Sequence, residues 1–181
     1  MLGIVFFLNE EAAHVRLVNS RVARPVAFAR YAGAALAAFA VGGGLDAIFL
    51  PKAEHVEELT RTAALLDRFE ASAKLKAGAV EVIPMFESAL GVYRCFDLLQ
   101  ASPRVATSCI GSAQDGDLQT DLGCAWSVDG PELLYARSKV LLDTRAAGKL
   151  YPLDGVFSDL GDEEAFVRDS TLSARLGYVG R

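Results

Sequence analysis

The sequence has no excess of basic residues. It carries 18 Lys and Arg against 23 Asp and Glu, which gives a formal net charge of −5. Proteins that bind nucleic acid neutralise phosphates with a basic face, so this balance argues against a nucleic-acid partner. The hydrophobic fraction of 52% also excludes a disordered chain, because that much apolar surface can be buried in a core.

Cysteine and histidine are scarce. The three cysteines, Cys95, Cys109 and Cys124, are widely separated, and no CxxC pair exists. This spacing indicates neither a structural zinc site nor a disulfide framework, and it predicts reduced thiols in a cytoplasmic protein. The two histidines, His14 and His55, lack the context of a catalytic triad or a metal site, so we interpret them as surface or capping residues.

Long apolar runs are missing as well. The stretch Tyr31–Leu45 is apolar throughout, but it is rich in Ala and Gly and shorter than the ~20 residues of a membrane-spanning helix. The N-terminal run MLGIVFFLNEE has no basic residues before it and two acids directly after it, which argues against a signal peptide. We therefore expect no membrane partner.

What the sequence contains is an alternation of short β-rich runs and longer helical patterns. Such alternation predicts βαβ units, a parallel sheet and an α/β fold in a single domain over residues 1–181. The predicted strands are Val15–Val18, Leu45–Leu50, Val80–Phe86, Arg104–Ile110 and Tyr151–Phe157. The predicted helices are Val26–Ala40, Glu54–Ser72, Ser88–Leu99, Pro131–Gly148 and Asp162–Leu176, and a polar loop is expected over Gly111–Gly130.

Polar side chains occur where these strands end, which is where parallel α/β folds carry their chemistry. The candidates are Arg16 within the first strand, Asn19 at its end, Lys52 after the second strand, Glu87 after the third, and Asp115 and Asp117 in the loop after the fourth. Two carboxylates with waters are a usual way to hold Mg²⁺. An arginine opposite them would suit a substrate carboxylate.

Each candidate also has a purely structural interpretation. Glu87 is placed to cap the helix that follows it, since acids favour the first turn. The Asp115-Gly116-Asp117 segment fits an ordinary loop with Asx turns. Arg16 and Lys52 fit plain surface charges. The residues alone leave these alternatives open.

Five segments together resemble the aldolase/citrate lyase family, the citrate lyase beta-subunit-like group that includes malyl-CoA and citramalyl-CoA lyases. They are LDAIFLPKAEHVEEL, VIPMFESALGV, DLQTDLGCAW, ELLYARSKVLLDTRAAG and YPLDGVFSDLGDEE, in that order. The resemblance covers the chain from about Val15 to Arg181. It implies a TIM-barrel enzyme that uses Mg²⁺ to cleave a 3-hydroxyacyl thioester carboxylate into an acyl-CoA and a 2-oxo acid, and that forms a homo-oligomer.

The resemblance also implies roles for the candidate residues. Glu87 is the first metal carboxylate, and Asp117 is the second, with Asp115 as the alternative because the spacing from Gly111 is longer than usual. Arg16 resembles the arginine that holds the substrate carboxylate, next to Asn19, although one extra residue separates the two. Lys52 matches a recurrent lysine at the rim of the barrel and is a candidate catalytic residue with Arg16.

Parts of the family pattern are missing from the sequence. We find no acidic D-L-E-D motif near the start and no G-K-x-x-I-H-P segment after LGYVGR, and MLGIVFFLNEE does not resemble the family's first strand. About five of the eight barrel strands are recognisable, so we expect an incomplete barrel, truncated at both ends. Two alternative functions follow: a pyruvate-type aldolase that acts on free 2-oxo acids, or a non-catalytic fragment or accessory subunit.

Overall fold

A parallel sheet lies at the centre of the computed structural model, which describes residues 5–6, 26–28, 46–159 and 161–181. Its five strands pair in sequence order, each with the next. They are β1 (Val5–Phe6), β2 (Val26–Phe28), β3 (Ala47–Leu50), β4 (Glu81–Phe86) and β5 (Cys109–Ile110). Every pairing is parallel, as the alternating sequence pattern predicts.

The parallel order continues beyond β5 through single bridges. Leu153 pairs in parallel with Cys109, and Gly180 pairs in parallel with Leu153. The backbone of the described residues therefore runs through five strands and two further strand positions in one direction. This continuous parallel order is the arrangement of an α/β barrel wall.

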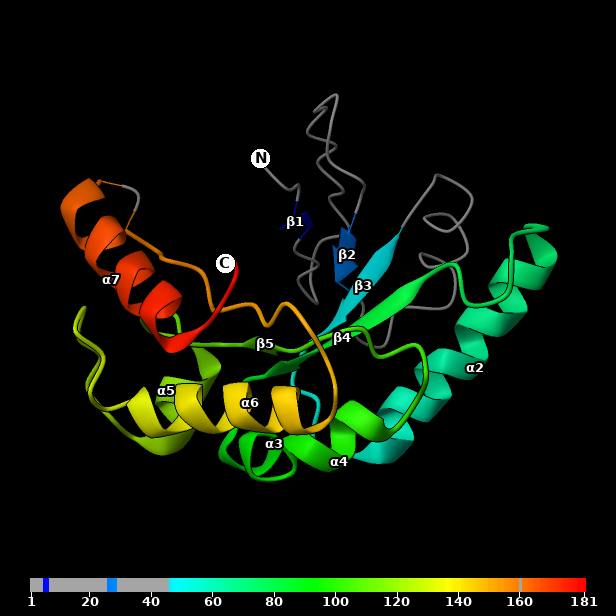
Figure 1. Cartoon of the computed structure of the whole chain (residues 1–181), viewed down its shortest axis with the longest axis horizontal. Helices are drawn as coiled ribbons and strands as arrows, with labels where there is room; N and C mark the ends of the chain where they lie inside the picture. The colour runs from blue at the N-terminus through cyan, green and yellow to red at the C-terminus, as the bar shows by residue number, and fades with distance from the viewer. Residues whose placement is uncertain (1–4, 7–25, 29–45, 160) are drawn as a thin grey trace.

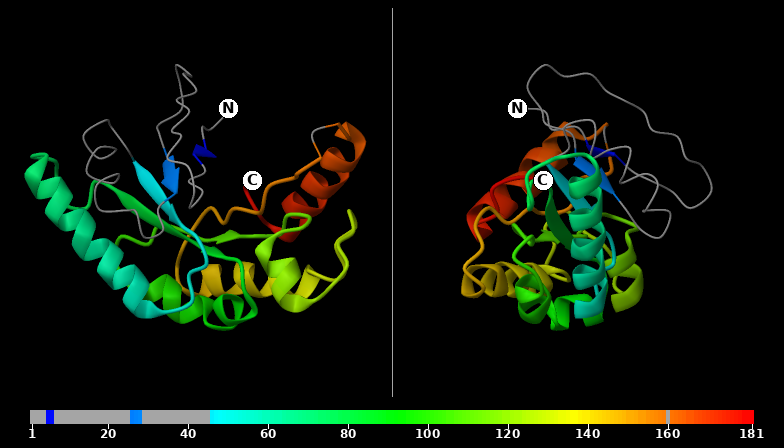
Figure 2. Two further views of the ribbon diagram at one scale, coloured as in Figure 1. Left: turned by 180° about the vertical axis from the view of Figure 1, so that it is seen from behind. Right: turned by 90° about the vertical axis from the view of Figure 1, so that its right-hand side faces the viewer.

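The helices follow the strands along one side of this sheet (Figures 1 and 2). They are α2 (Val56–Ser72), α3 (Ala89–Tyr93), α4 (Cys95–Gln100), α5 (Asp117–Leu122), α6 (Leu134–Ala146) and α7 (Glu163–Leu176). In the view of Figure 1, α2 lies at one end of the arc, α7 at the other, and α3, α4 and α6 lie between them. No helix in the described ranges is long and apolar enough to span a membrane.

Alternate residues of β3, β4 and β5 face opposite sides of the sheet and enter two separate cores. Ile48, Val82 and Ile110 pack with helix residues such as Leu66 and Val140 in the larger core, between sheet and helices. The smaller core is on the other face, where Phe49, Ile83 and Cys109 meet with Ala47, Met85 and Leu153. This second core lies where a barrel has its interior.

The strand predictions are confirmed in the middle of the chain, and one helix prediction near its start is wrong over part of its length. The predicted strands Leu45–Leu50 and Val80–Phe86 contain β3 and β4. The helix predicted from Val26 is wrong over its first residues, because Val26–Phe28 pair with β3 as strand β2. The rest of that helix and the strand Val15–Val18 lie outside the described residues.

Two further predicted strands are shorter in the structure than expected, and one segment that was not predicted to be a strand forms one. Arg104–Ile110 contributes β5 and one bridge at Val105, and Tyr151–Phe157 contributes only the bridge at Leu153. Pro152 and Gly155 flank that bridge, and both residue types disfavour a regular strand. Within the N-terminal run that did not resemble a family strand, Val5–Phe6 pairs with β2 as strand β1.

The helix predictions from Glu54 onward hold with three differences. Ser88–Leu99 is two short helices, α3 and α4, which meet at Arg94 with non-helical backbone angles. The predicted polar loop Gly111–Gly130 contains the helix α5, which ends at Gly123 in the left-handed conformation. The helix expected from Pro131 begins at Leu134, after a turn.

A buried ion cluster ties α2 to the sheet. Arg104 donates to Glu70 Oε1 (2.7 Å) and to the Val80 carbonyl (2.8 Å), and it also pairs with Asp67. Glu70 is only 1% exposed and accepts backbone N–H groups from Gly78 and Val80 at 2.8 Å each. The hydrogen bonds of Arg104 come first among the causes that lower the pKa of Glu70 to about 2.

Candidate active site

Lys52 contacts the two leading carboxylate candidates at the C-terminal ends of the strands. Its backbone N–H donates to Glu87 Oε2 at 3.0 Å, and its Nζ lies 2.5 Å from Asp117 Oδ2. The backbone of Lys52 is left-handed, with φ of 47°, which is uncommon for a residue with a Cβ. The turn after β3 therefore directs one residue toward carboxylates from two other segments.

Glu87 occupies a fitted position after β4. A Cβ placed on Gly111 would lie only 2.6 Å from Glu87 Cγ and 3.2 Å from Glu87 Oε1. The Gly111 N–H also donates to the Phe86 carbonyl at 3.0 Å. Glycine at position 111 therefore lets the start of the loop after β5 pass directly beside the Glu87 side chain.

Helix α5 brings Asp117 to the same place. Asp117 is the first residue of this helix, and Leu118 beneath it is fully buried. One turn later, Asp121 Oδ2 accepts the N–H of Ala89 at 2.6 Å, two residues after Glu87. The helix is thereby attached to the chain directly after β4, so Asp117 and Glu87 share one region at the strand ends.

The other candidates have different outcomes. Asp115 is exposed, has a left-handed backbone with φ of 57°, and donates its N–H to Gln119 Oε1 at 2.7 Å. Among described residues, the ion pair of Lys52 is with Asp117, not with Asp115. Arg16 and Asn19 lie outside the described residues.

The donor set fits a hard cation. Carboxylate oxygens are the ligands Mg²⁺ prefers, and it usually takes one or two of them and keeps waters. The ammonium of Lys52 beside the half-exposed Asp117 carboxylate already shows that this place accommodates a positive charge. Within the described ranges, no group of three or more His, Cys, Asp or Glu side chains could hold a metal, so the set here is two carboxylates.

A buried polar network holds the loop that leads to Asp117. Asp154 is 1% exposed and accepts from Ser112 Oγ at 2.7 Å, from Ser173 Oγ at 2.5 Å and from Arg137 Nε at 3.1 Å. The N–H of Gly155 donates to Asp154 Oδ1 at 2.8 Å and to Ser112 Oγ at 3.2 Å. The residue after Gly111 is thus held in place by Asp154 and Gly155.

Four charges balance within this network. Arg137 lies between Asp154 and Asp169, and Arg181 pairs with Asp169 at 2.5 Å. Burial opposes the ionisation of Asp154, but Arg137 outweighs it and holds the pKa of that carboxyl below its ordinary value. Two cations against two anions leave the buried cluster neutral.

The thiol of Cys109, two residues before Gly111, is buried. Cys109 is part of β5 and 5% exposed. Burial raises its pKa well above the ordinary range, and the negative charges of Glu87 and Asp154 add to the effect. Since the thiolate is the nucleophilic form, Cys109 has no nucleophilic role here.

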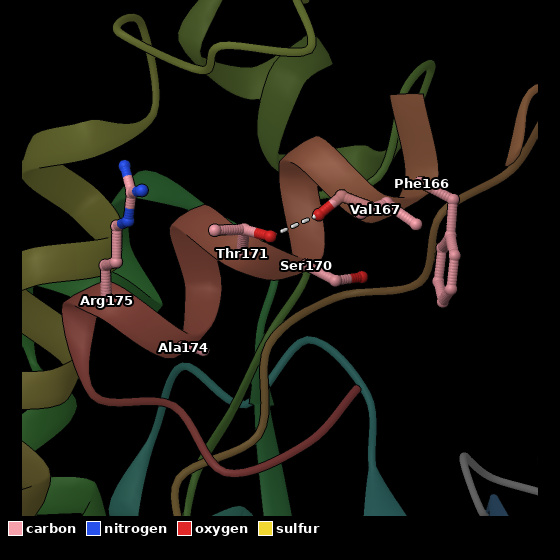
Figure 3. A pocket seen from close by; sticks show the side chains of 6 residues that line it. All are labelled: Phe166, Val167, Ser170, Thr171, Ala174 and Arg175. Carbon is pink, nitrogen blue, oxygen red and sulfur yellow. Dashed lines mark hydrogen bonds between the residues drawn. The ribbon is translucent and has the colours of Figure 1, made fainter. Parts of the chain in front are cut away.

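A hollow of about 500 Å³ lies elsewhere, along α7 (Figure 3). Its lining consists of α7 residues, namely Phe166, Val167, Ser170, Thr171, Ala174 and Arg175. Thr171 donates to the Val167 carbonyl within the helix, so this hydroxyl is already satisfied. The hollow shares no residue with the carboxylate site.

Sequence reasoning missed the residues that support the site, namely Gly111, Ser112, Arg137 and Asp154. One signal was available for Asp154: it is a carboxylate inside an apolar run, and a buried carboxylate requires a partner. The partners are 17 to 42 residues away in sequence, so a single sequence does not reveal them.

Solved structures support the barrel fold. RipC from Yersinia pestis matches 86% of this chain and 66% of its own with a TM-score of 0.65 at 22% identity. A citrate lyase beta subunit from M. tuberculosis, complexed with oxaloacetate and magnesium, matches 81% of this chain and 60% of its own with a TM-score of 0.59 at 23% identity. The fold is α/β and of the TIM-barrel type, as predicted.

Curated relatives give the closer sequence comparison. Citrate lyase subunit beta of Leuconostoc mesenteroides subsp. cremoris is 35% identical over 141 residues, 78% of this chain and 45% of that protein. Mitochondrial citramalyl-CoA lyase of Mus musculus is 31% identical over 146 residues, 75% of this chain and 41% of that protein. The chain thus spans less than half the length of these relatives.

The family model for HpcH/HpaI aldolase/citrate lyase matches residues 5–181. The match begins at β1, so the expectation that the N-terminal run lies outside the family pattern is wrong. It also includes the turn at Lys52, the end of β4 and the start of α5, which carry the residues of the candidate site. The chain belongs to the HpcH/HpaI aldolase/citrate lyase family.

Proposed function

We propose that the chain carries the metal site of a Mg²⁺-dependent carbon–carbon lyase. The substrate is a 3-hydroxyacyl-CoA with a distal carboxylate, of the malyl, citramalyl or citryl type, and the products are an acyl-CoA and a 2-oxo acid. The family and the names of its relatives, citrate lyase beta subunit and citramalyl-CoA lyase, support this reaction class. The proposed working form is a homo-oligomer, as the family resemblance implies.

One observation carries the proposal: Lys52 contacts both Glu87 and Asp117 at the strand ends. The catalytic end of a barrel is the C-terminal end of its strands. Two acidic side chains from different segments, each contacted there by Lys52, supply the oxygen ligands that a divalent cation prefers. A pair of surface carboxylates would not require Gly111 packed against one of them.

The proposed roles follow from these contacts. Glu87 and Asp117 hold the metal ion, and Lys52 orients both carboxylates, one through its backbone N–H and one through its ammonium. Arg16, with Asn19, is proposed to bind the substrate carboxylate on the basis of the family resemblance. Asp115 stays an alternative to Asp117, with less support because the ion pair of Lys52 is with Asp117.

The chemistry that a bound Mg²⁺ supplies at such a site is Lewis-acid polarisation of a carbonyl oxygen. The chain's own part is to fix the substrate so that the scissile carbon–carbon bond is oriented for cleavage. The strand-end site does this from rigid elements, since Glu87 directly follows β4 and Asp117 begins α5.

The test is cleavage of citramalyl-CoA, malyl-CoA and citryl-CoA by the purified chain in the presence of Mg²⁺. We expect Glu87→Gln to lower kcat/KM at least about 100-fold, because it removes a charged metal ligand. The matched control is Glu81→Gln, which neutralises an exposed carboxylate at the opposite end of the same strand. It should leave kcat/KM unchanged within about twofold.

Three outcomes would decide against the proposal. Cleavage of free 4-hydroxy-2-oxo acids with no action on thioesters would favour the pyruvate-type aldolase. Complete inactivity of a folded wild-type chain would favour an accessory role. An equal loss of kcat/KM in Glu81→Gln and Glu87→Gln would show that Glu87 is not a metal ligand.

A further inference from the structure

The loop from Gly111 to Asp117 connects two chemical environments. Its start lies against Glu87, and its end carries Asp117 at the beginning of α5. Between them, Ser112 is 4% exposed and joins the buried network of Asp154.

We infer that Ser112, held by Asp154 and Arg137, is a positioning residue for the carboxylate site. This inference deepens the proposed function and rests on it. The hydroxyl of Ser112 fixes the peptide next to Gly111, and Gly111 sets the place of the Glu87 side chain. The same loop fixes where α5, and therefore Asp117, begins.

The contacts hold Ser112 from several directions. Its Oγ donates to Asp154 Oδ1 at 2.7 Å and accepts the Gly155 N–H at 3.2 Å. Its carbonyl accepts from Trp126 Nε1 at 3.1 Å. A Cβ placed on Gly155 would lie 2.5 Å from the Ser112 nitrogen, so the backbone at Gly155 packs tightly against the loop. Little freedom of movement is left to this peptide.

Asp154 itself is fixed from the helix layer. Arg137 comes from α6, and Ser173 and Asp169 come from α7. Arg137 binds Asp154 and Asp169 together, so the carboxylate of Asp154 has one orientation relative to both helices. The helix layer is thereby connected to the loop that follows β5. Polar partners behind the ligands orient a metal site in this way.

The chain offers a matched pair of serines for the test. Ser112 and Ser173 are buried alike, at 4% and 3% exposed, and each donates to one oxygen of Asp154. Only Ser112 belongs to the loop that leads to Asp117, because Ser173 lies on α7. Replacing Ser112 by alanine removes its hydrogen bonds with Asp154 and Gly155, and replacing Ser173 removes those with Asp154, Arg137 and the Asp169 carbonyl. Neither substitution removes a charge.

The experiment measures Mn²⁺ binding to the full chain by electron paramagnetic resonance. We expect Ser112→Ala to raise the Mn²⁺ Kd about tenfold, in the range for loss of a group that supports a ligand. Ser173→Ala should change it less than twofold. Equal effects of the two substitutions, or no effect of Ser112→Ala, would overturn the inference.

A second readout is independent of the metal. Trp126 is the only tryptophan, and its indole N–H donates a hydrogen bond to the Ser112 carbonyl. Ser112→Ala should shift its emission maximum to longer wavelength, whereas Ser173→Ala and Glu87→Gln should not. An unshifted emission in Ser112→Ala would also overturn the inference.

The two proposals fail differently. If the wild-type chain binds no Mn²⁺, the proposed function fails, and the positioning role fails with it. If the wild-type chain binds Mn²⁺ and Glu87→Gln does not, while Ser112→Ala behaves like Ser173→Ala, the metal site stands and only the role of Ser112 is wrong.

Discussion

Gly111 lies so close to Glu87 that a Cβ on residue 111 would stand 2.6 Å from Glu87 Cγ. Gly111→Ala should therefore displace the Glu87 side chain and weaken Mn²⁺ binding by about tenfold or more, because the ligand loses its orientation. Isothermal titration of Mn²⁺ into the variant measures this. Gly161→Ala, at an exposed turn, is the control and should bind like wild type. Unchanged binding in Gly111→Ala would mean that Glu87 tolerates displacement.

Two substitutions of Lys52 separate the effect of its backbone conformation from the effect of its side chain. Lys52→Gly keeps the left-handed backbone, and with it the N–H donated to Glu87, but removes the ammonium from Asp117. Lys52→Ala removes the same ammonium and keeps the strained backbone. We expect both variants to lose lyase activity to a similar degree, at least about tenfold in kcat/KM.

The stabilities of the two Lys52 variants should differ in a defined direction. A left-handed backbone costs a residue with a Cβ about 1 kcal/mol, and glycine avoids that cost. Urea unfolding should therefore show Lys52→Gly at least as stable as Lys52→Ala. Activity retained in both variants would exclude a role for the ammonium, and activity retained in Lys52→Gly alone would assign the role to the backbone.

Glu70 should make stability depend on acid pH. Its pKa is about 2 in the folded chain against an ordinary value of 4.5. Folding thus favours the ionised form, so the stabilisation is fully present above about pH 4.5 and is lost as the pH falls toward 2. The full effect is about 3 kcal/mol, since each pKa unit corresponds to about 1.4 kcal/mol. Urea unfolding between pH 2 and pH 7 measures it.

Glu70→Gln should remove much of that pH dependence and cost about 3 kcal/mol at pH 7, because Arg104 is left buried without its main partner. Glu57→Gln, which neutralises an exposed acid in the first turn of the same helix, should cost under about 1 kcal/mol. The same pH dependence in Glu70→Gln as in wild type would place the titrating group elsewhere.

The thiols should react unequally. Burial raises the pKa of both Cys95 and Cys109 well above the ordinary range, whereas Cys124 is half-buried. A thiol-specific chromogenic reagent at pH 8 should label Cys124 first, and the other two only after unfolding in urea. Peptide mapping identifies the labelled site. Rapid labelling of Cys109 in the native chain would contradict the buried position of β5.

The sequence predicted the elements whose signals are local. The strands β3 and β4 are short apolar runs bounded by turn residues, α2 has apolar positions at helical spacing, and α7 ends at a glycine stop, Gly177. The helix α5 was missed although it has a glycine stop, because Gly116 and the acids around it also fit a polar loop. Its two turns bury only Leu118, which is too little for a recognisable period.

The same distinction between local and long-range signals applies to the residues of the site. Glu87 and Asp117 were candidates because a carboxylate after a strand is visible in sequence, and the family resemblance ordered them. The partnerships that place them were not visible: Lys52 is 35 residues from Glu87, and Ser112 is 42 residues from Asp154. Such pairs follow from the barrel topology, which sets adjacent strand ends side by side.

The backbone of Lys52 has a consequence for how position 52 can vary. Selection for stability alone would favour glycine or asparagine there, because these residues adopt positive φ at low cost. Selection for the site favours a cation beside Asp117. A library randomised at this one position should therefore divide, with small residues enriched by a protease-resistance screen and lysine enriched by an activity screen.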